Sequence, residues 1–178
     1  MKRKPLLKLT LSALFIAMGL LLPLLTGQIK EIGSMLLPMH LPILLCGLLC
    51  GWQYGLAVGF ITPLLRSVTF GMPMLYPNAV SMAFELATYG AVIGLCYRLF
   101  KKKSIASLYA SLIIAMISGR LVWGLAQTVL LGFGGKLFTL AAFWAGGFAN
   151  AFPGILIQLV LIPAIMLLLK RLKITEKV

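Results

Sequence analysis

The chain has 178 residues, of which 61% are hydrophobic and only 11% are charged, and its mean hydropathy is +1.07. A soluble domain has about 45–50% apolar and about 25% charged residues, so this composition argues against a soluble enzyme. The net charge of +13 gathers beside apolar segments, whereas a nucleic-acid-binding protein needs a basic surface on a soluble fold. We therefore expect an integral membrane protein that binds no nucleic acid.

Charge-free stretches mark the expected membrane spans. About 20 apolar residues suffice for a helix to cross a bilayer, and several stretches without Lys, Arg, Asp or Glu reach or exceed this length. We predict six transmembrane helices, at about residues 9–27, 36–51, 53–68, 76–97, 105–131 and 138–169. The expected fold is an all-α bundle that forms a single domain over residues 1–178.

Basic residues predict the orientation of this bundle. Twelve of the 16 Lys and Arg residues lie in three clusters, at the N-terminus, around residue 101 and at the C-terminus. Cytoplasmic loops of membrane proteins carry such an excess, and anionic lipid headgroups are sufficient partners for it. Both termini are therefore predicted to be cytoplasmic. The first apolar stretch has no small-residue cleavage site, so we expect a span rather than a signal peptide.

Small residues recur at helical spacing along the first three spans. Ala13 and Ala17 lie one turn apart in the first span, and glycines occupy every fourth position from 47 to 59. Such spacing lets helix backbones approach closely in lipid. We expect the second and third spans to pack tightly across the turn at GWQYG. The sequence LPMHLP, at the start of the second span, predicts that His40 lies at the outer rim of the bundle.

Few residues could support catalysis. The chain has three acidic residues and one histidine, His40, whereas a metalloprotease needs two histidines and a carboxylate. Cys46 and Cys50 share a helical face and could hold zinc with His40, but buried free cysteines usually behave as small hydrophobic residues. The sequence GFGGKLF lacks the first glycine and the Ser or Thr of a phosphate-binding loop. We expect no enzyme, metal or cofactor.

Two charged residues fall inside the fourth and fifth predicted spans. Glu85 and Arg120 lie nine and eleven residues from the outer ends of these spans, which places them roughly 14 and 16 Å deep at 1.5 Å per residue. An unpaired charge there costs about 2.5–3.5 kcal/mol. We expect both side chains to line or brace a pocket floor, with Asn150 close by. A pair that only fixes helix packing is the alternative.

The sequence LPMHLPILLCGLLCGWQYGLAVGFITPLLRS, followed by GMPMLYPNAVSMAFELATYG, resembles the substrate-binding S component of energy-coupling factor (ECF) transporters. It is most similar to the branch that includes pantothenate, hydroxymethylpyrimidine and pyridoxine carriers, over about residues 10–97. The resemblance implies a bacterial plasma-membrane protein with a vitamin pocket near its outer face. It further implies docking through Ala13 and Ala17 onto a membrane scaffold subunit, which works with two ATPase subunits.

The expected function is thus to bind and carry a small water-soluble vitamin. In the outer half, four basic residues oppose two acidic ones, which favours a carboxylate such as pantothenate. Pyridoxine or a thiamine precursor would need aromatic stacking instead. A stand-alone carrier and a membrane-embedded enzyme are further alternatives, the latter disfavoured by the shortage of acids and histidines. The expected substrate-binding residues are His40, Arg66, Tyr76, Asn78, Glu85, Arg120, Trp123, Gln127, Trp144 and Asn150.

Overall fold

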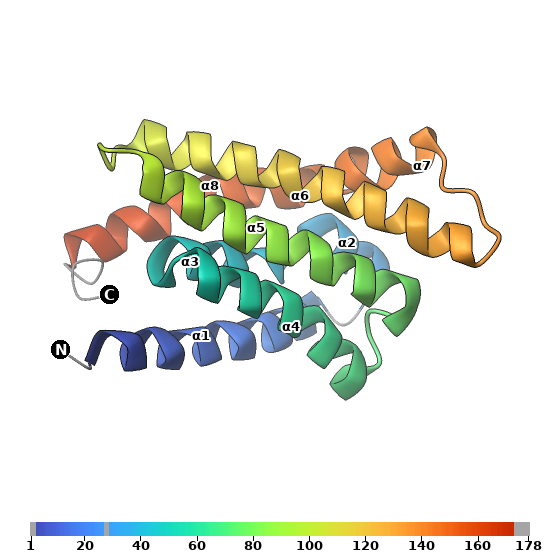
Figure 1. The fold of residues 1–178 in the computed structure, drawn as a ribbon, viewed down its shortest axis with the longest axis horizontal. Coiled ribbons are helices and arrows are strands. Elements are labelled where there is room, and N and C mark those ends of the chain that lie inside the picture. Colours follow the sequence, from blue (N-terminus) through green and yellow to red (C-terminus); the bar gives the residue numbers. More distant parts are fainter. Residues whose placement is uncertain (1–2, 27–28, 173–178) are drawn as a thin grey trace.

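A computed structural model of the chain describes residues 3–26 and 29–172, and its elements are helices (Figure 1). The short elements are the 3₁₀ helix η1 (Leu22–Thr26), the π-helical segments η2 (Leu75–Ala79) and η3 (Ala145–Ala149), and the helices α2 (Lys30–Leu36) and α7 (Leu140–Trp144). The longer helices are α1 (Arg3–Leu21), α3 (His40–Cys50), α4 (Trp52–Phe70), α5 (Val80–Leu99), α6 (Ile105–Phe133) and α8 (Phe152–Arg171).

Five helical segments have the length and apolar composition needed to cross a membrane. They are Pro5–Leu25, Glu31–Cys50, Leu75–Leu99, Ile105–Phe133 and Leu140–Arg171. The third predicted span corresponds to α4, which has 19 residues but is not one of these five segments. The described residues therefore form an all-helical protein with five candidate spans, and the count of six stays a prediction.

The second predicted span, 36–51, corresponds to α3, which begins only at His40, and the last predicted span is broken. Between α2 and α3, Leu37 adopts a left-handed conformation with φ 50° and ψ 47°, and its backbone N–H donates to the carbonyl oxygen of Gly33, which ends α2. The last predicted span is divided into α7, η3 and α8, and Pro153 lies in the first turn of α8. A proline fits there because its missing N–H would have no helical partner at that position.

The helix α5 lies at the centre of the bundle and packs against α3, α4 and α6. Glycines make this packing close. A Cβ atom added at Gly55 of α4 would lie 2.8 Å from the Cα atom of Gly47 and 2.8 Å from the carbonyl carbon of Gly90 on α5. The predicted close approach of the second and third spans therefore occurs, but it also includes α5.

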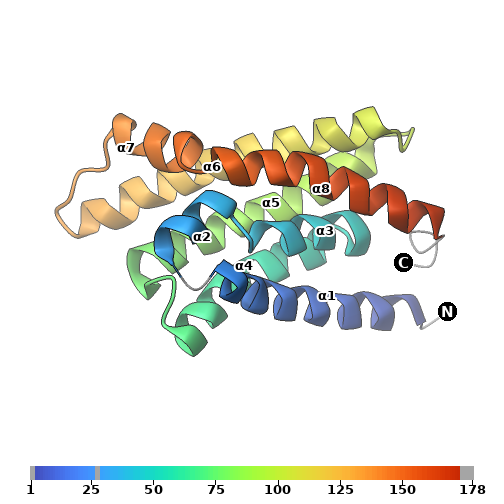
Figure 2. The ribbon, with the colours of Figure 1, turned by 180° about the vertical axis from the view of Figure 1, so that it is seen from behind.

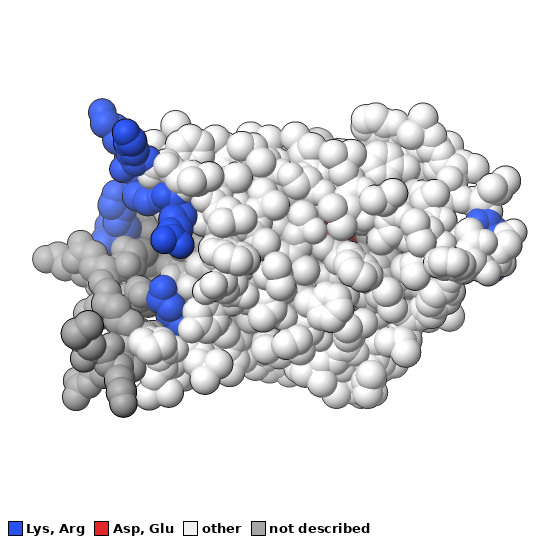
Figure 3. Space-filling view, viewed as in Figure 1, with Lys and Arg blue, Asp and Glu red and all other residues white. Residues whose placement is uncertain are grey.

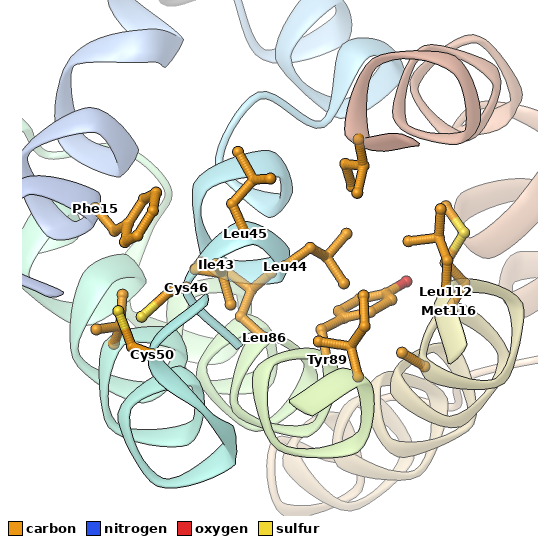
Figure 4. Packing of buried hydrophobic residues seen from close by; sticks show 14 of the residues in the cluster. Phe15, Ile43, Leu44, Leu45, Cys46, Cys50, Leu86, Tyr89, Leu112 and Met116 are labelled. Carbon is orange, nitrogen blue, oxygen red and sulfur yellow. The ribbon is translucent and has the colours of Figure 1, made fainter. Parts of the chain in front are cut away.

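Apolar side chains from several helices fill the space on both sides of α5. Figure 4 shows Phe15 of α1, Leu44 of α3, Leu86 and Tyr89 of α5 and Leu112 of α6 in this core. Cys46 and Cys50 belong to the same cluster, and the sulfur of Cys46 lies 3.8 Å from the hydroxyl oxygen of Ser12. These cysteines are therefore packed in the core, on α3 beside α1.

The start of α1, the end of α8 and the connection between α5 and α6 lie at one end of the molecule (Figures 1 and 2). Lys and Arg side chains gather at this end, as Figure 3 shows. Among the described residues, exposed members of the basic clusters include Arg98, Lys101, Lys170 and Arg171. The fold thus brings charges that are far apart in the sequence to one basic end.

Candidate functional site

A cavity of about 410 Å³ lies in the half of the bundle away from the basic end, where α1 passes into η1 and where α4 connects to η2. Its wall draws on the N-terminal part of α3 and on α5, α6, α2 and η3. The polar and charged residues of the wall are Ser34, His40, Arg66, Asn78, Glu85, Arg120 and Gln127. A cavity of this volume fits a small organic molecule.

A buried ion pair forms part of the cavity wall. The Nη1 atom of Arg120 lies 2.8 Å from the Oε1 atom of Glu85, and the two residues are 4% and 1% exposed. The Nε2 atom of His40, itself 1% exposed, lies 3.4 Å from the same oxygen. Buried charges need such partners because desolvation strongly penalises an isolated ion. We call these three residues the charged cluster.

Helix geometry explains how the charged cluster is assembled. Glu85 and Tyr89 are one turn apart on α5 and therefore share its buried face. The ring of Tyr89 meets the ring of His40 edge to face, with centroids 5.2 Å apart. A Cβ atom at Gly119 would lie 2.9 Å from the Tyr89 ring, so the glycine before Arg120 leaves space for this tyrosine between α5 and α6.

Parts of the charged cluster have unused hydrogen-bonding capacity. Within the described residues, the Nε and Nη2 atoms of Arg120 are buried without a protein hydrogen-bond partner. A buried polar group left unpaired costs about 1–3 kcal/mol, and a charged one costs more. Arg120 therefore keeps hydrogen-bonding capacity that no described residue uses.

Arg66 contributes a second positive charge to the cavity wall. Its Nη1 atom donates a hydrogen bond to the backbone oxygen of Leu20, near the end of α1, and its guanidinium carbon lies 5.1 Å from the centroid of the Phe70 ring. The residue is 2% exposed. Two arginines and one glutamate leave the wall with one positive charge in excess when His40 is neutral.

Seven of the ten sequence-predicted binding residues line this cavity: His40, Arg66, Asn78, Glu85, Arg120, Trp123 and Gln127. His40 lies deeper in the bundle than predicted. It was expected at the outer rim, but its side chain contacts Glu85 in the interior. The amide nitrogen of Gln127 donates to the hydroxyl of Ser81 at 3.0 Å, which links α6 to α5.

Three predicted residues lie elsewhere. Tyr76 is 48% exposed and donates its hydroxyl to the backbone oxygen of Leu130. Trp144 is 56% exposed and borders a shallow surface hollow with Phe148. Asn150 is exposed at the junction of η3 and α8. The depth predicted for Asn150 assumed one straight helix over 138–169, and the break at this junction invalidates that assumption.

Sequence reasoning missed the apolar part of the cavity wall. Met39, Met72, Met74 and Met82 all contribute to it. Methionine side chains are flexible and adapt to irregular surfaces, so this wall can fit ligands of differing shape. Three methionines within residues 72–82 could have indicated this wall, but methionine is common in membrane helices and by itself does not predict a cavity. Ser34 was missed because α2 was not predicted as a separate helix.

The two alanines predicted to contact a scaffold differ in exposure. Ala13 is exposed and Ala17 is half-buried. Ser12, Phe15 and Gly19 of the same helix are buried, since α1 packs against α3 and α4 with that face. The face that carries Ala13 therefore lies outside the bundle core.

The apolar helices and the charged internal cavity define a multi-pass membrane protein able to hold a small molecule. The family model "ECF transporter, substrate-specific component" matches residues 7–166, and the chain belongs to this family. Membership implies a transporter subunit, not an enzyme, that recognises a small-molecule substrate and associates with ECF scaffold and ATPase subunits. Comparisons with curated proteins and with solved structures gave no match.

Proposed function

We propose that this chain captures a small water-soluble vitamin in the 410 Å³ cavity and delivers it inward together with a scaffold subunit and two ATPase subunits. The observation that carries the proposal is the charged cluster in the wall of that cavity. Buried ionisable groups inside a membrane protein are costly and commonly mark substrate sites. Family membership supplies the transport context.

The proposed orientation follows from the charge distribution. The basic end carries the Lys and Arg clusters (Figure 3), and such clusters favour the cytoplasmic side. The cavity would then open toward the outer side of a bacterial plasma membrane, where substrate is captured. In this arrangement α4 counts as the sixth span, and both termini are cytoplasmic.

Pantothenate is the vitamin that we propose first, because the cavity wall carries one excess positive charge and pantothenate has a carboxylate. Pyridoxine or a thiamine precursor is the second candidate, favoured by Trp123 in the wall. The Trp123 ring stacks on Phe143 at 28° with centroids 6.2 Å apart, and one face of such an aromatic pair could accept a ligand ring.

The test is to identify what the protein retains. The chain is purified in lipid nanodiscs, and small molecules released on denaturation are analysed by mass spectrometry. Calorimetric titrations with pantothenate, pyridoxine and hydroxymethylpyrimidine follow. We expect pantothenate to bind at micromolar or lower concentration. Tight binding of the neutral pyrimidine with none of pantothenate would overturn this choice, and the absence of any vitamin ligand would overturn the proposed function.

A stand-alone carrier is distinguished by its independence from partners. Uptake of radiolabelled pantothenate is measured in cells that express the chain alone and in cells that also express ECF scaffold and ATPase subunits. We expect uptake only in the second strain. Equal uptake in both strains would favour the stand-alone carrier.

A further inference from the structure

The guanidinium group of Arg120 has one edge occupied and one edge free. Arginine presents five N–H donors in a planar fork. The Nη1 atom of Arg120 lies 2.8 Å from the Oε1 atom of Glu85, whereas its Nε and Nη2 atoms have no partner among the described residues. The Nε–H and one Nη2–H bond lie side by side and point the same way, which is the geometry that grips two carboxylate oxygens at once. The free edge is therefore a complete bidentate donor.

The other charged groups of the wall are less suited to an anion. The carboxylate of Glu85 only accepts hydrogen bonds and repels a second anion. Arg66 already donates to the Leu20 backbone oxygen and lies against the Phe70 ring. Arg66 adds positive potential, but among the described residues it is Arg120, not Arg66, whose Nε and Nη2 atoms are buried without a hydrogen-bond partner.

We infer that the Nε–Nη2 edge of Arg120 binds a singly charged carboxylate of the substrate, and that Glu85 is a positioning residue that fixes this edge without touching the substrate. The inference rests on the proposed function of the cavity and assigns its substrate class. The single excess positive charge of the wall matches a monoanion. The methionines of the wall face the remaining, less polar part of such a molecule.

The test uses butyrate, with butyramide as an uncharged probe of nearly the same shape. The chain has five arginines, so their side-chain Nε–Hε signals can be resolved by NMR in ¹⁵N-arginine-labelled protein in nanodiscs. Each signal is assigned with an Arg→Lys variant. We expect butyrate, and not butyramide, to shift the Arg120 signal saturably. An equal response to butyramide, no response to butyrate, or a shift of the Arg66 signal in its place would overturn the inference.

A charge-conserving substitution tests the edge itself. Arg120→Lys keeps the positive charge but removes the bidentate donor, so we expect its butyrate affinity to fall about tenfold or more, with Arg98→Lys at the basic end as the matched control. Unchanged butyrate affinity in Arg120→Lys would overturn the inference. If this variant does not fold, the NMR experiment on the wild-type protein tests the inference by itself. Vitamin binding that is indifferent to the carboxylate would leave the proposed function standing without this anion site. A butyrate response without vitamin binding would leave the anion site standing and overturn the proposed function.

Discussion

Gly90 of α5 lies with its backbone directly against the backbone of Gly55 on α4. A Cβ atom added at Gly90 would lie 2.8 Å from the Cα atom of Gly55 and closer still to its carbonyl group. Neither backbone can move without displacing a whole helix. Because lipid provides little hydrophobic driving force between helices, close packing of this kind is a main source of helix association. The contact also holds α5, which carries Glu85, in place.

Substitution Gly90→Ala should therefore reduce the free energy of unfolding by about 1–3 kcal/mol, the usual cost of overpacking. Gly132→Ala in α6 is the matched control, since a Cβ atom there meets nothing within 4 Å and alanine is the better helix former. Thermal unfolding in nanodiscs compares the two variants. Equal unfolding midpoints of the two variants would show that α4 and α5 accommodate the added methyl group without loss of stability.

Breaking the ion pair should affect both stability and affinity. Glu85→Gln should reduce the free energy of unfolding by about 3–5 kcal/mol, because it leaves the Arg120 charge buried without its partner. Arg120→Ala should weaken binding of the native ligand at least about tenfold, or about 1.4 kcal/mol. Titration calorimetry on folded protein measures the affinity of the Arg120→Ala variant, and thermal unfolding measures the stability of Glu85→Gln.

A double-mutant cycle separates the two roles of this pair. Glu85→Gln combined with Arg120→Met should cost less stability than the two single changes together, with a coupling of about 0.5–3 kcal/mol. If Arg120→Ala loses stability while the surviving folded protein keeps its affinity, the pair serves helix packing alone.

Replacing Ala13 or Ala17 with Trp should block assembly with the scaffold subunit and abolish uptake, because a bulky side chain prevents close approach of the helices. Ligand binding by the isolated chain should be retained, most clearly for the Ala13 variant, since Ala13 is exposed whereas Ala17 is half-buried. Co-purification with the scaffold subunit measures assembly. Ile117→Trp, at a residue of α6 that is 51% exposed, is the control for added bulk. Lost binding with intact assembly would show that these alanines pack internally.

Gln158 of α8 is 1% exposed, and neither polar atom of its amide has a hydrogen-bond partner among the described residues. Gln158→Met should raise the free energy of unfolding by about 1 kcal/mol or more, because it removes buried polar atoms that gain nothing from folding. Gln53→Met is the control, at an exposed position of α4, where we expect a change within about 0.5 kcal/mol. A destabilised Gln158→Met variant would show that the amide has a polar partner in the native protein.

The membrane class, and the burial of Glu85 and Arg120 inside the bundle, could be predicted from sequence. Several long charge-free stretches in one chain favour membrane spans, and a charge within such a span is expected to face the protein interior because lipid does not solvate it. The same reasoning placed both residues at similar depth. In the structure they form an ion pair, with 2.8 Å between Nη1 of Arg120 and Oε1 of Glu85. Their role in ligand binding stays a prediction.

The errors arose where local backbone geometry decides position. Asn150 was placed by counting along a straight helix, but the chain turns between η3 and α8 at this residue. His40 was expected at the rim, but α3 begins at this residue and its side chain lies beside Glu85 in the interior. A proline indicates that a helix is interrupted, whereas the direction in which the chain continues depends on the helices that pack around it.

The sequence by itself therefore determined that this chain is a helical membrane protein with a few buried charges, because hydropathy and charge act over each segment independently of its neighbours. Only the tertiary structure decided which charges share a site. His40, Glu85 and Arg120 come from three helices, and their meeting depends on glycine contacts and helix breaks whose geometry follows from packing of the whole bundle. The unoccupied edge of Arg120 is likewise a property of that packing, since Glu85 engages Nη1 and no described residue engages Nε or Nη2.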